Sequence, residues 1–191
     1  MKAVVLICSL LLVSILSIII YFTSETTVTE QLDSHIYSLP YKPGSSHKIV
    51  QGYGGRFSHT EKAALDFEMP EGTPIYAARG GKVKSYKDNS DEGGIFTSET
   101  KSNYILIQHS DGSIGCYYHL KKNGVLTKSG NVRQGQLIGY SGKTGFALQP
   151  HLHFAVKKIL NYKKDSYVRT KFKTSKGIML LRNGVIYKNP E

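Results

Sequence analysis

Residues 104–118 read YILIQHSDGSIGCYY, in which two short apolar runs flank the turn pair Asp111-Gly112. β-Branched and aromatic residues favour strands, and Asp-Gly between two such runs is one of the strongest short-range hairpin signals. Residues 74–86 predict a second hairpin, with Gly80-Gly81 as its two-residue turn. Further short apolar runs occupy residues 136–141 and 151–156. The sequence therefore predicts a mainly β, antiparallel fold, with no long amphipathic helix in this part of the chain.

The length and charge of the chain limit the classes of protein to consider. With 191 residues, it suits one domain and a short appendage. The 25 basic and 14 acidic residues give a net charge of +11, which favours anionic surroundings such as nucleic acid, acidic lipid or a polyanionic cell wall. The charge alone does not choose among them. The two cysteines, Cys8 and Cys116, provide no disulfide framework, and we expect Cys116 to be a packed small hydrophobe.

The N-terminus is a long apolar segment, because residues 3–22 contain no charge. About 20 apolar residues is the length of a membrane-spanning helix, and no good cleavage site follows, so residues 1–24 are predicted to be a membrane anchor rather than a cleaved signal. Either would export the rest of the chain. Residues 25–48 are interpreted as a polar linker and residues 49–191 as the domain. Its basic tail, residues 157–176, is either a solvated edge strand or a segment attracted to an anionic wall or lipid surface.

Several histidines and one aspartate could form a metal site. Residues at i and i+2 of a strand point to the same face, so His151 and His153 would share a cleft. Asp66 stands between Leu65 and Phe67, where a buried carboxylate is costly unless it is paired, hydrogen-bonded or bound to a cation. A polar turn at residues 60–62 could bring His59 beside it. Two imidazoles and one carboxylate, with a fourth position open, are typical of catalytic zinc sites.

An ordered series of motifs runs from about residue 50 to residue 157. It comprises His59 with Asp66-Phe67, Gly72-Thr73-Pro74, Ala77-Ala78, residues 80–83, residues 103–108, Tyr118-His119-Leu120, Gly135 with Ile138-Gly139, Gly142-Lys143-Thr144-Gly145, and Pro150-His151-Leu152-His153-Phe154. In this order the motifs resemble the lysostaphin-type zinc metallopeptidases, peptidase family M23, also called LytM-type endopeptidases. Members of that family cut peptide bonds in bacterial peptidoglycan.

The resemblance implies a two-layer antiparallel β fold with Zn²⁺ in a groove. Position by position, it makes His59, Asp66 and His153 the zinc ligands and His119 and His151 the catalytic histidines. No glutamate base of the H-E-x-x-H kind is present, so a histidine would manage the proton.

Two tyrosines lie beside these site residues in the sequence. Tyr53, six positions before His59, resembles a tyrosine that assists the oxyanion in several members of the family, although among 13 tyrosines a packed or rim position is the favoured interpretation. Tyr118 alternates with His119 and is predicted to face the core. The polar residues 88–102 are either a wall of the groove or a simple solvent loop.

The expected function is zinc-dependent hydrolysis of peptidoglycan cross-links from an exported, membrane-anchored position in the cell envelope, with no nucleic acid partner. The six residues between His59 and Asp66 also resemble D-Ala-D-Ala carboxypeptidases, but the Glu-x-x-His pair of that class is absent. A second alternative is a non-hydrolytic LytM-like module that binds the wall and activates a separate amidase. A third is a basic β domain that merely adheres to wall polymer. The presence of all five metal and catalytic positions favours the enzyme.

Overall fold

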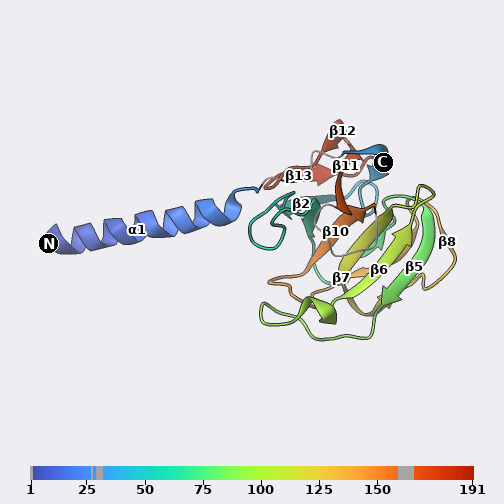
Figure 1. Ribbon diagram of the computed structural model, residues 1–191, viewed down its shortest axis with the longest axis horizontal. Coiled ribbons are helices and arrows are strands. Elements are labelled where there is room, and N and C mark those ends of the chain that lie inside the picture. The colour runs from blue at the N-terminus through green and yellow to red at the C-terminus, as the bar shows by residue number, and fades with distance from the viewer. Residues whose placement is uncertain (1, 27, 29–31, 159–165) are drawn as a thin grey trace.

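The computed structural model describes residues 2–26, 28, 32–158 and 166–191, and these form one helix followed by a β domain (Figure 1). The helix, α1 (Lys2–Thr23), extends away from the domain. The strands are β1 (Leu32–Ser38), β2 (Ser46–Gln51), β3 (Ala64–Glu68), β4 (Pro74–Tyr76), β5 (Gly81–Lys87), β6 (Asn103–Gln108), β7 (Ile114–Val125), β8 (Asn131–Val132), β9 (Leu137–Ser141), β10 (His151–Lys157), β11 (Tyr167–Thr174), β12 (Gly177–Leu180) and β13 (Ile186–Lys188). A short 3₁₀ turn spans Glu99–Lys101.

The main sheet has the strand order β13-β2-β3-β10-β7-β6-β5-β8, and every neighbouring pair in it is antiparallel. Strand β4 pairs with β9, which also joins β7, and β11 joins β10 and β12. Among the described strands, only β1 and β11 pair in parallel. The prediction of a mainly antiparallel β domain with one N-terminal helix is confirmed.

Of the two predicted hairpins, one is correct. Strands β6 and β7 pair around Asp111-Gly112, with Gln108 opposite Ile114. The hairpin at residues 74–86 is wrong, because β4 pairs with β9 and β5 pairs with β6 and β8. A Cβ on Gly81 would lie 2.3 Å from the carbonyl oxygen of Gln108, so this glycine serves the close approach of β6 and not a turn.

The core is built from alternate residues of the central strands together with aromatic side chains from both ends of the domain. Phe154 of β10 contacts Tyr117 and Phe172, with ring centroids 5.1 and 5.7 Å apart. Leu152 and Val156 flank it on the same face and are buried, so the opposite face of β10 is left for the two histidines. Cys116 is also fully buried, and burial raises the pKa of its thiol to about 12, as expected for a packed small hydrophobe.

The residues expected in the polar linker contribute to this core. Strand β1 pairs with β11, and Tyr37, Leu39 and Tyr41 are buried. The sequence predicted a linker because these apolar residues are spread among polar ones and show no sustained period. In the folded chain each of them nevertheless packs into the core. Residues 27 and 29–31 of the predicted linker lie outside the described residues. The division into anchor, linker and domain stays a prediction.

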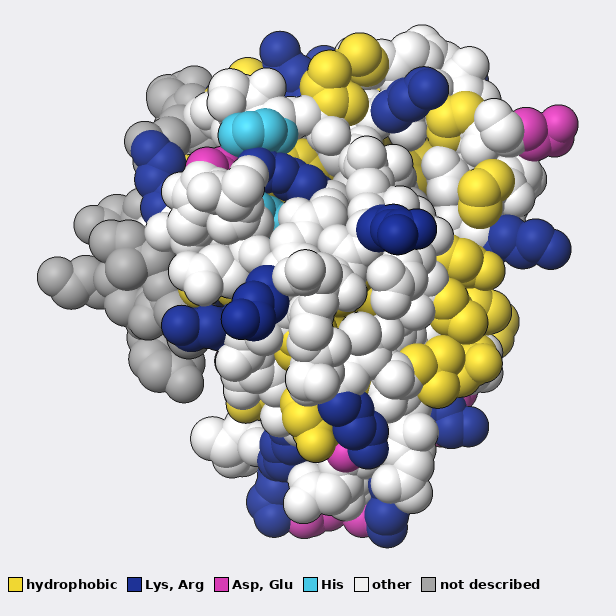
Figure 2. Space-filling view, turned by 90° about the vertical axis from the view of Figure 1, so that its right-hand side faces the viewer, with side chains coloured by type: hydrophobic (Ala, Val, Ile, Leu, Met, Phe, Trp, Pro, Cys, Tyr) yellow, Lys and Arg dark blue, Asp and Glu magenta, His cyan; other side chains and the backbone are white. Residues whose placement is uncertain are grey.

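On the face shown in Figure 2, Lys and Arg side chains are spread among apolar and uncharged ones and do not gather in one patch. In the basic tail, β11 pairs with three strands and is therefore not an edge, and residues 159–165 lie outside the described part of the chain. The described side chains of α1 are exposed. Within the described residues, however, no helix is both long and apolar enough to cross a membrane, so the predicted anchor is not supported.

Candidate metal centre

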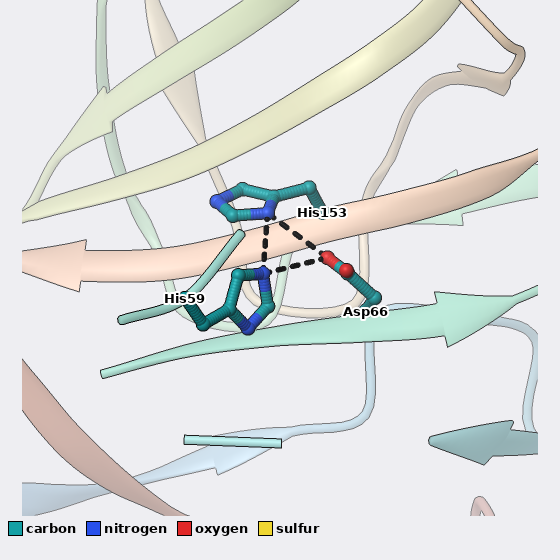
Figure 3. Close-up of side chains that lie close together, drawn as sticks. All are labelled: His59, Asp66 and His153. Atoms are coloured by element: carbon teal, nitrogen blue, oxygen red, sulfur yellow. Dashed lines mark hydrogen bonds and ion pairs between the residues drawn. The ribbon is translucent and has the colours of Figure 1, made fainter. Parts of the chain in front are cut away.

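Three of the predicted site residues converge where β3 and β10 pair (Figure 3). Asp66 of β3 stands directly opposite His153 of β10, so their side chains project from the same face of the sheet. His59 reaches them from the loop at residues 52–63 between β2 and β3. Its Nε2 atom lies 3.1 Å from His153 Nδ1 and 3.1 Å from Asp66 Oδ1, and the last two atoms are 2.9 Å apart.

The donor set in this cluster fits a metal ion of intermediate softness. Two imidazole nitrogens and one carboxylate oxygen point at a common centre, and zinc is commonly held by these ligands. His59 is fully buried, and its Nδ1 lies 3.0 Å from the carbonyl oxygen of Gly52. A carbonyl oxygen can only accept a hydrogen bond, so in the neutral ring the Nδ1 atom carries the proton and Nε2 offers its lone pair to the cluster.

The environment of Asp66 favours its ionised form. Burial by itself raises the pKa of this carboxyl, but the neighbouring His59, His151 and His153 outweigh it and hold the pKa well below its usual range. The outer oxygen, Oδ2, accepts a hydrogen bond of 3.2 Å from Gln51 Nε2. The cluster therefore offers a charged oxygen ligand at neutral pH.

The two predicted catalytic histidines lie beside this cluster. His119 and His151 have ring centroids 4.5 Å apart, and His151 Nε2 is 3.7 Å from Asp66 Oδ1. His119 has a φ of 64°, a left-handed conformation that is uncommon for a residue other than glycine. The register of β6 and β7 skips His119, since Tyr104 pairs with Tyr118 and the next pair joins Asn103 to Leu120. His119 is thus the extra residue of a β-bulge, a device that re-aims a side chain.

Backbone carbonyl groups fix the proton position on both rings. His119 Nδ1 lies 2.7 Å from the carbonyl oxygen of Thr144, and His151 Nδ1 lies 2.8 Å from that of Gln149. The neutral rings therefore carry their protons on Nδ1 and leave Nε2 as the acceptor. Burial, followed by the nearby His151 and His153, lowers the pKa of His119 to about 3, so its ring is neutral at pH 7.

Known proteins resemble this chain in sequence. The family model of peptidase family M23 matches residues 60–168, more than half of the chain. The chain belongs to peptidase family M23. Peptidoglycan DD-endopeptidase ShyA of Vibrio cholerae is 40% identical over 121 residues, which cover 60% of this chain and 26% of the relative. Peptidoglycan DD-endopeptidase ShyC of the same organism is 41% identical over 90 residues, covering 47% of this chain and 18% of the relative.

Solved structures of the family are also similar. The catalytic domain of lysostaphin from Staphylococcus simulans aligns with 26% identity and a TM-score of 0.46, covering 64% of this chain and 86% of that one. The chain spans about a quarter, or less, of the length of the curated M23 relatives named above.

A groove of about 880 Å³ lies beside the cluster of His59, Asp66 and His153. Asp66, His119, His151 and His153 line it, and so does Tyr118, which was expected to face the core. That expectation is wrong because the bulge at His119 breaks the strict alternation of side chains along β7. The groove is also lined by Glu99, Thr100 and Ser102, so part of the loop at residues 88–102 forms a wall of it.

Tyr53 does not line this groove. The side chain is buried, and its hydroxyl lies 3.0 Å from the carbonyl oxygen and 3.1 Å from Oγ1 of Thr170. The packed interpretation of this tyrosine is therefore the one that the structure supports.

A second group of described residues, Asp33, His35 and Asp111, also has the spacing of metal ligands. It differs from the cluster of His59, Asp66 and His153 because His35 and Asp111 are exposed and Arg79 Nη1 lies 3.1 Å from Asp111 Oδ2. A guanidinium already balances this carboxylate, so the group does not require a cation.

All five predicted site residues are thus brought together, while three supporting residues were missed. Gln51 contacts Asp66 and also donates to Ser58 Oγ over 2.6 Å. Ser102 Oγ accepts from the backbone N–H of His119 over 3.0 Å, and the carbonyl oxygen of Thr144 accepts from His119 Nδ1 over 2.7 Å. Thr144 lies in a motif that the family resemblance includes, whereas no pattern near Gln51 or Ser102 indicates their contacts.

Proposed function

We propose that this chain is a zinc-dependent endopeptidase that hydrolyses peptide cross-links of bacterial peptidoglycan. The observation that carries the proposal is the convergence of His59 Nε2, Asp66 Oδ1 and His153 Nδ1 at separations of 2.9 to 3.1 Å beside a groove. Membership of the M23 family supports peptidase chemistry, and two relatives named as peptidoglycan DD-endopeptidases support the substrate class.

His59, Asp66 and His153 would hold the metal. When bound, zinc would act as a Lewis acid that polarises the scissile carbonyl and lowers the pKa of the attacking water. Gln51 and the carbonyl of Gly52 keep Asp66 and His59 oriented, and such outer contacts are worth about 10-fold to 100-fold in metal affinity.

His119 and His151 would manage the proton. The Nδ1 atom of each ring is committed to a backbone carbonyl, so Nε2 is the atom that can accept a proton from water or pass one to the leaving amine. The neutral state of His119 at pH 7 suits it to begin as an acceptor. Both histidines line the groove of about 880 Å³ in which a substrate would meet the metal.

The position of the substrate sets where the domain works. Peptidoglycan lies outside the cytoplasmic membrane, so the proposal places the domain in the cell envelope. A net charge of +11 favours residence near an anionic wall.

Digestion of purified peptidoglycan by the full chain tests the proposal. Samples with and without a chelator are compared, and new amino termini are identified by labelling and mass spectrometry. We expect chelator-sensitive new termini that reappear when zinc is added back, and their loss in His153→Ala but not in His47→Ala. A zinc-loaded chain that releases no new termini from any wall type, yet accelerates an added wall amidase, would instead favour the non-hydrolytic alternative.

A further inference from the structure

The three members of the metal cluster are not held equally firmly. Asp66 and His153 lie on β3 and β10, which are paired strands near the middle of the main sheet. His59 lies in the loop at residues 52–63, which forms no named strand. The position of its imidazole therefore depends on what fixes that loop.

The loop contains two residues in the left-handed region, one on each side of His59. Gly54 has a φ of 70° and Glu61 a φ of 58°. Glycine adopts this conformation readily, but Glu61 does so only where its surroundings hold it. The backbone N–H of Gly54 donates to the carbonyl oxygen of Lys62 over 3.0 Å, and this hydrogen bond joins the two ends of the loop.

The segment directly after α1 holds both of these residues through one side chain. Thr26 Oγ1 donates to the carbonyl oxygen of Gly54 over 2.9 Å and accepts from the backbone N–H of Glu61 over 2.9 Å. The backbone N–H of Thr26 also donates to Gly54 over 2.6 Å. A single hydroxyl thus links the two left-handed residues that bracket His59.

Neighbouring contacts extend this link to the helix. Ser24 Oγ lies 2.6 Å from Arg56 Nε, and the Arg56 guanidinium lies 4.7 Å from the centre of the Tyr21 ring in the last turn of α1. Glu25 forms an isolated β-bridge with Gly55. A Cβ on Gly54 would lie 2.2 Å from the carbonyl oxygen of Thr26. Residues 24–26 therefore approach the loop so closely that only glycine fits at position 54.

We propose that residues 24–26 are a positioning segment for the metal centre, in which the Thr26 hydroxyl holds the loop so that His59 Nε2 faces Asp66 and His153. This inference rests on the proposed zinc function and deepens it. Thr26 touches neither the metal ligands nor the groove, so it is a positioning residue and not a catalytic one. It follows that residues 24–26, directly after α1, are required for full metal affinity.

The test compares three variants of the full chain. Thr26→Val keeps the shape of the side chain and removes the hydroxyl, Thr26→Ser keeps the hydroxyl, and Thr127→Val makes the same change at a partly buried threonine far from the loop. The readouts are the zinc dissociation constant from chelator competition and the hydrogen-exchange rate of the Glu61 amide in the metal-free chain. Circular dichroism and thermal unfolding establish that each variant is folded.

We expect Thr26→Val to weaken zinc binding about 10-fold, the size of effect that outer contacts have on metal sites, and to speed exchange at Glu61. Thr26→Ser should keep both values near those of the wild type, and Thr127→Val should change neither. Zinc binding by the wild type with unchanged affinity in Thr26→Val would overturn the positioning role and leave the proposed function standing. A wild-type chain that binds no zinc would overturn the proposed function, and the positioning role with it.

Discussion

The Nδ1 atom of His119 lies 2.7 Å from the carbonyl oxygen of Thr144, and this contact decides which ring nitrogen is available for chemistry. The ring is neutral at pH 7 because burial, together with His151 and His153, lowers its pKa to about 3. A neutral imidazole with its proton on Nδ1 presents an acceptor at Nε2.

Replacing His119 by alanine should remove proton transfer and leave metal binding intact. General acid or base catalysis contributes about 10²-fold to 10⁴-fold, so we expect kcat on peptidoglycan fragments to fall within that range. Zinc content, measured on the same samples, should equal that of the wild type. His35→Ala is the control, because His35 is exposed and lies outside the groove. Full turnover by His119→Ala would remove this residue from the mechanism.

Replacing Gln51 by alanine should weaken metal binding without unfolding the domain. The Gln51 amide donates to Asp66 Oδ2 over 3.2 Å and to Ser58 Oγ over 2.6 Å, so it orients the carboxylate ligand. We expect the zinc dissociation constant to rise about 10-fold or more in a chelator competition. Gln108→Ala, a change on β6 outside the groove, should leave the zinc dissociation constant unchanged. Equal affinities in the two variants would contradict the orienting role.

Gly81 should be far less tolerant of a side chain than its neighbour Gly80. A Cβ on Gly81 would meet the carbonyl oxygen of Gln108 at 2.3 Å, whereas one on Gly80 would lie 3.1 Å from that of Val132. Forcing extra atoms into a packed site costs about 1 to 3 kcal/mol, so Gly81→Ala should lower the free energy of unfolding by that amount. Urea unfolding of both variants is the measurement. Comparable losses in the two would show that β5 and β6 do not approach this closely.

How far the sequence predicts the structure depends on whether a feature is local. The i and i+2 spacing of His151 and His153 correctly places both on the groove face, because β10 is regular. Tyr118 was misplaced because the bulge at His119 depends on contacts with Ser102 and Thr144, which come from distant parts of the chain. Gly81 was misinterpreted for the same reason, since its constraint comes from a neighbouring strand and not from a turn.

Cys116 should be inert in the folded protein. Burial raises the pKa of its thiol to about 12, so at pH 8 about one molecule in 10⁴ carries the reactive thiolate. Cys8 is exposed on α1 and provides an internal comparison. A maleimide should therefore label Cys8 in the native chain and label both cysteines only after denaturation. Rapid native labelling of Cys116 would contradict its burial.

The carboxylate of Asp111 should stabilise the fold only above acidic pH. Partial burial raises the pKa of this carboxyl, but hydrogen bonds from Ser113 and Arg79 outweigh it and hold the pKa below its usual value. Because the folded pKa is the lower one, the stabilisation is complete above the unfolded value of about 3.9, declines as pH falls below that value, and is lost as pH passes through the folded value. Urea midpoints of the wild type and Asp111→Asn should therefore differ at pH 6 and converge towards pH 2.

Asp91→Asn is the control for that titration, because the Asp91 to Lys122 pair is exposed and should contribute little at any pH. A difference in urea midpoint between the wild type and Asp111→Asn that stays constant from pH 6 to pH 2 would rule out the pairing with Arg79 as its source.

The proposed zinc site is tested most directly by an anomalous difference map from crystals of the chain grown with zinc and measured at the zinc absorption edge. We expect one strong peak within bonding distance of His59 Nε2, Asp66 Oδ1 and His153 Nδ1. A map without a peak there, or with the principal peak at Asp33, His35 and Asp111, would contradict it.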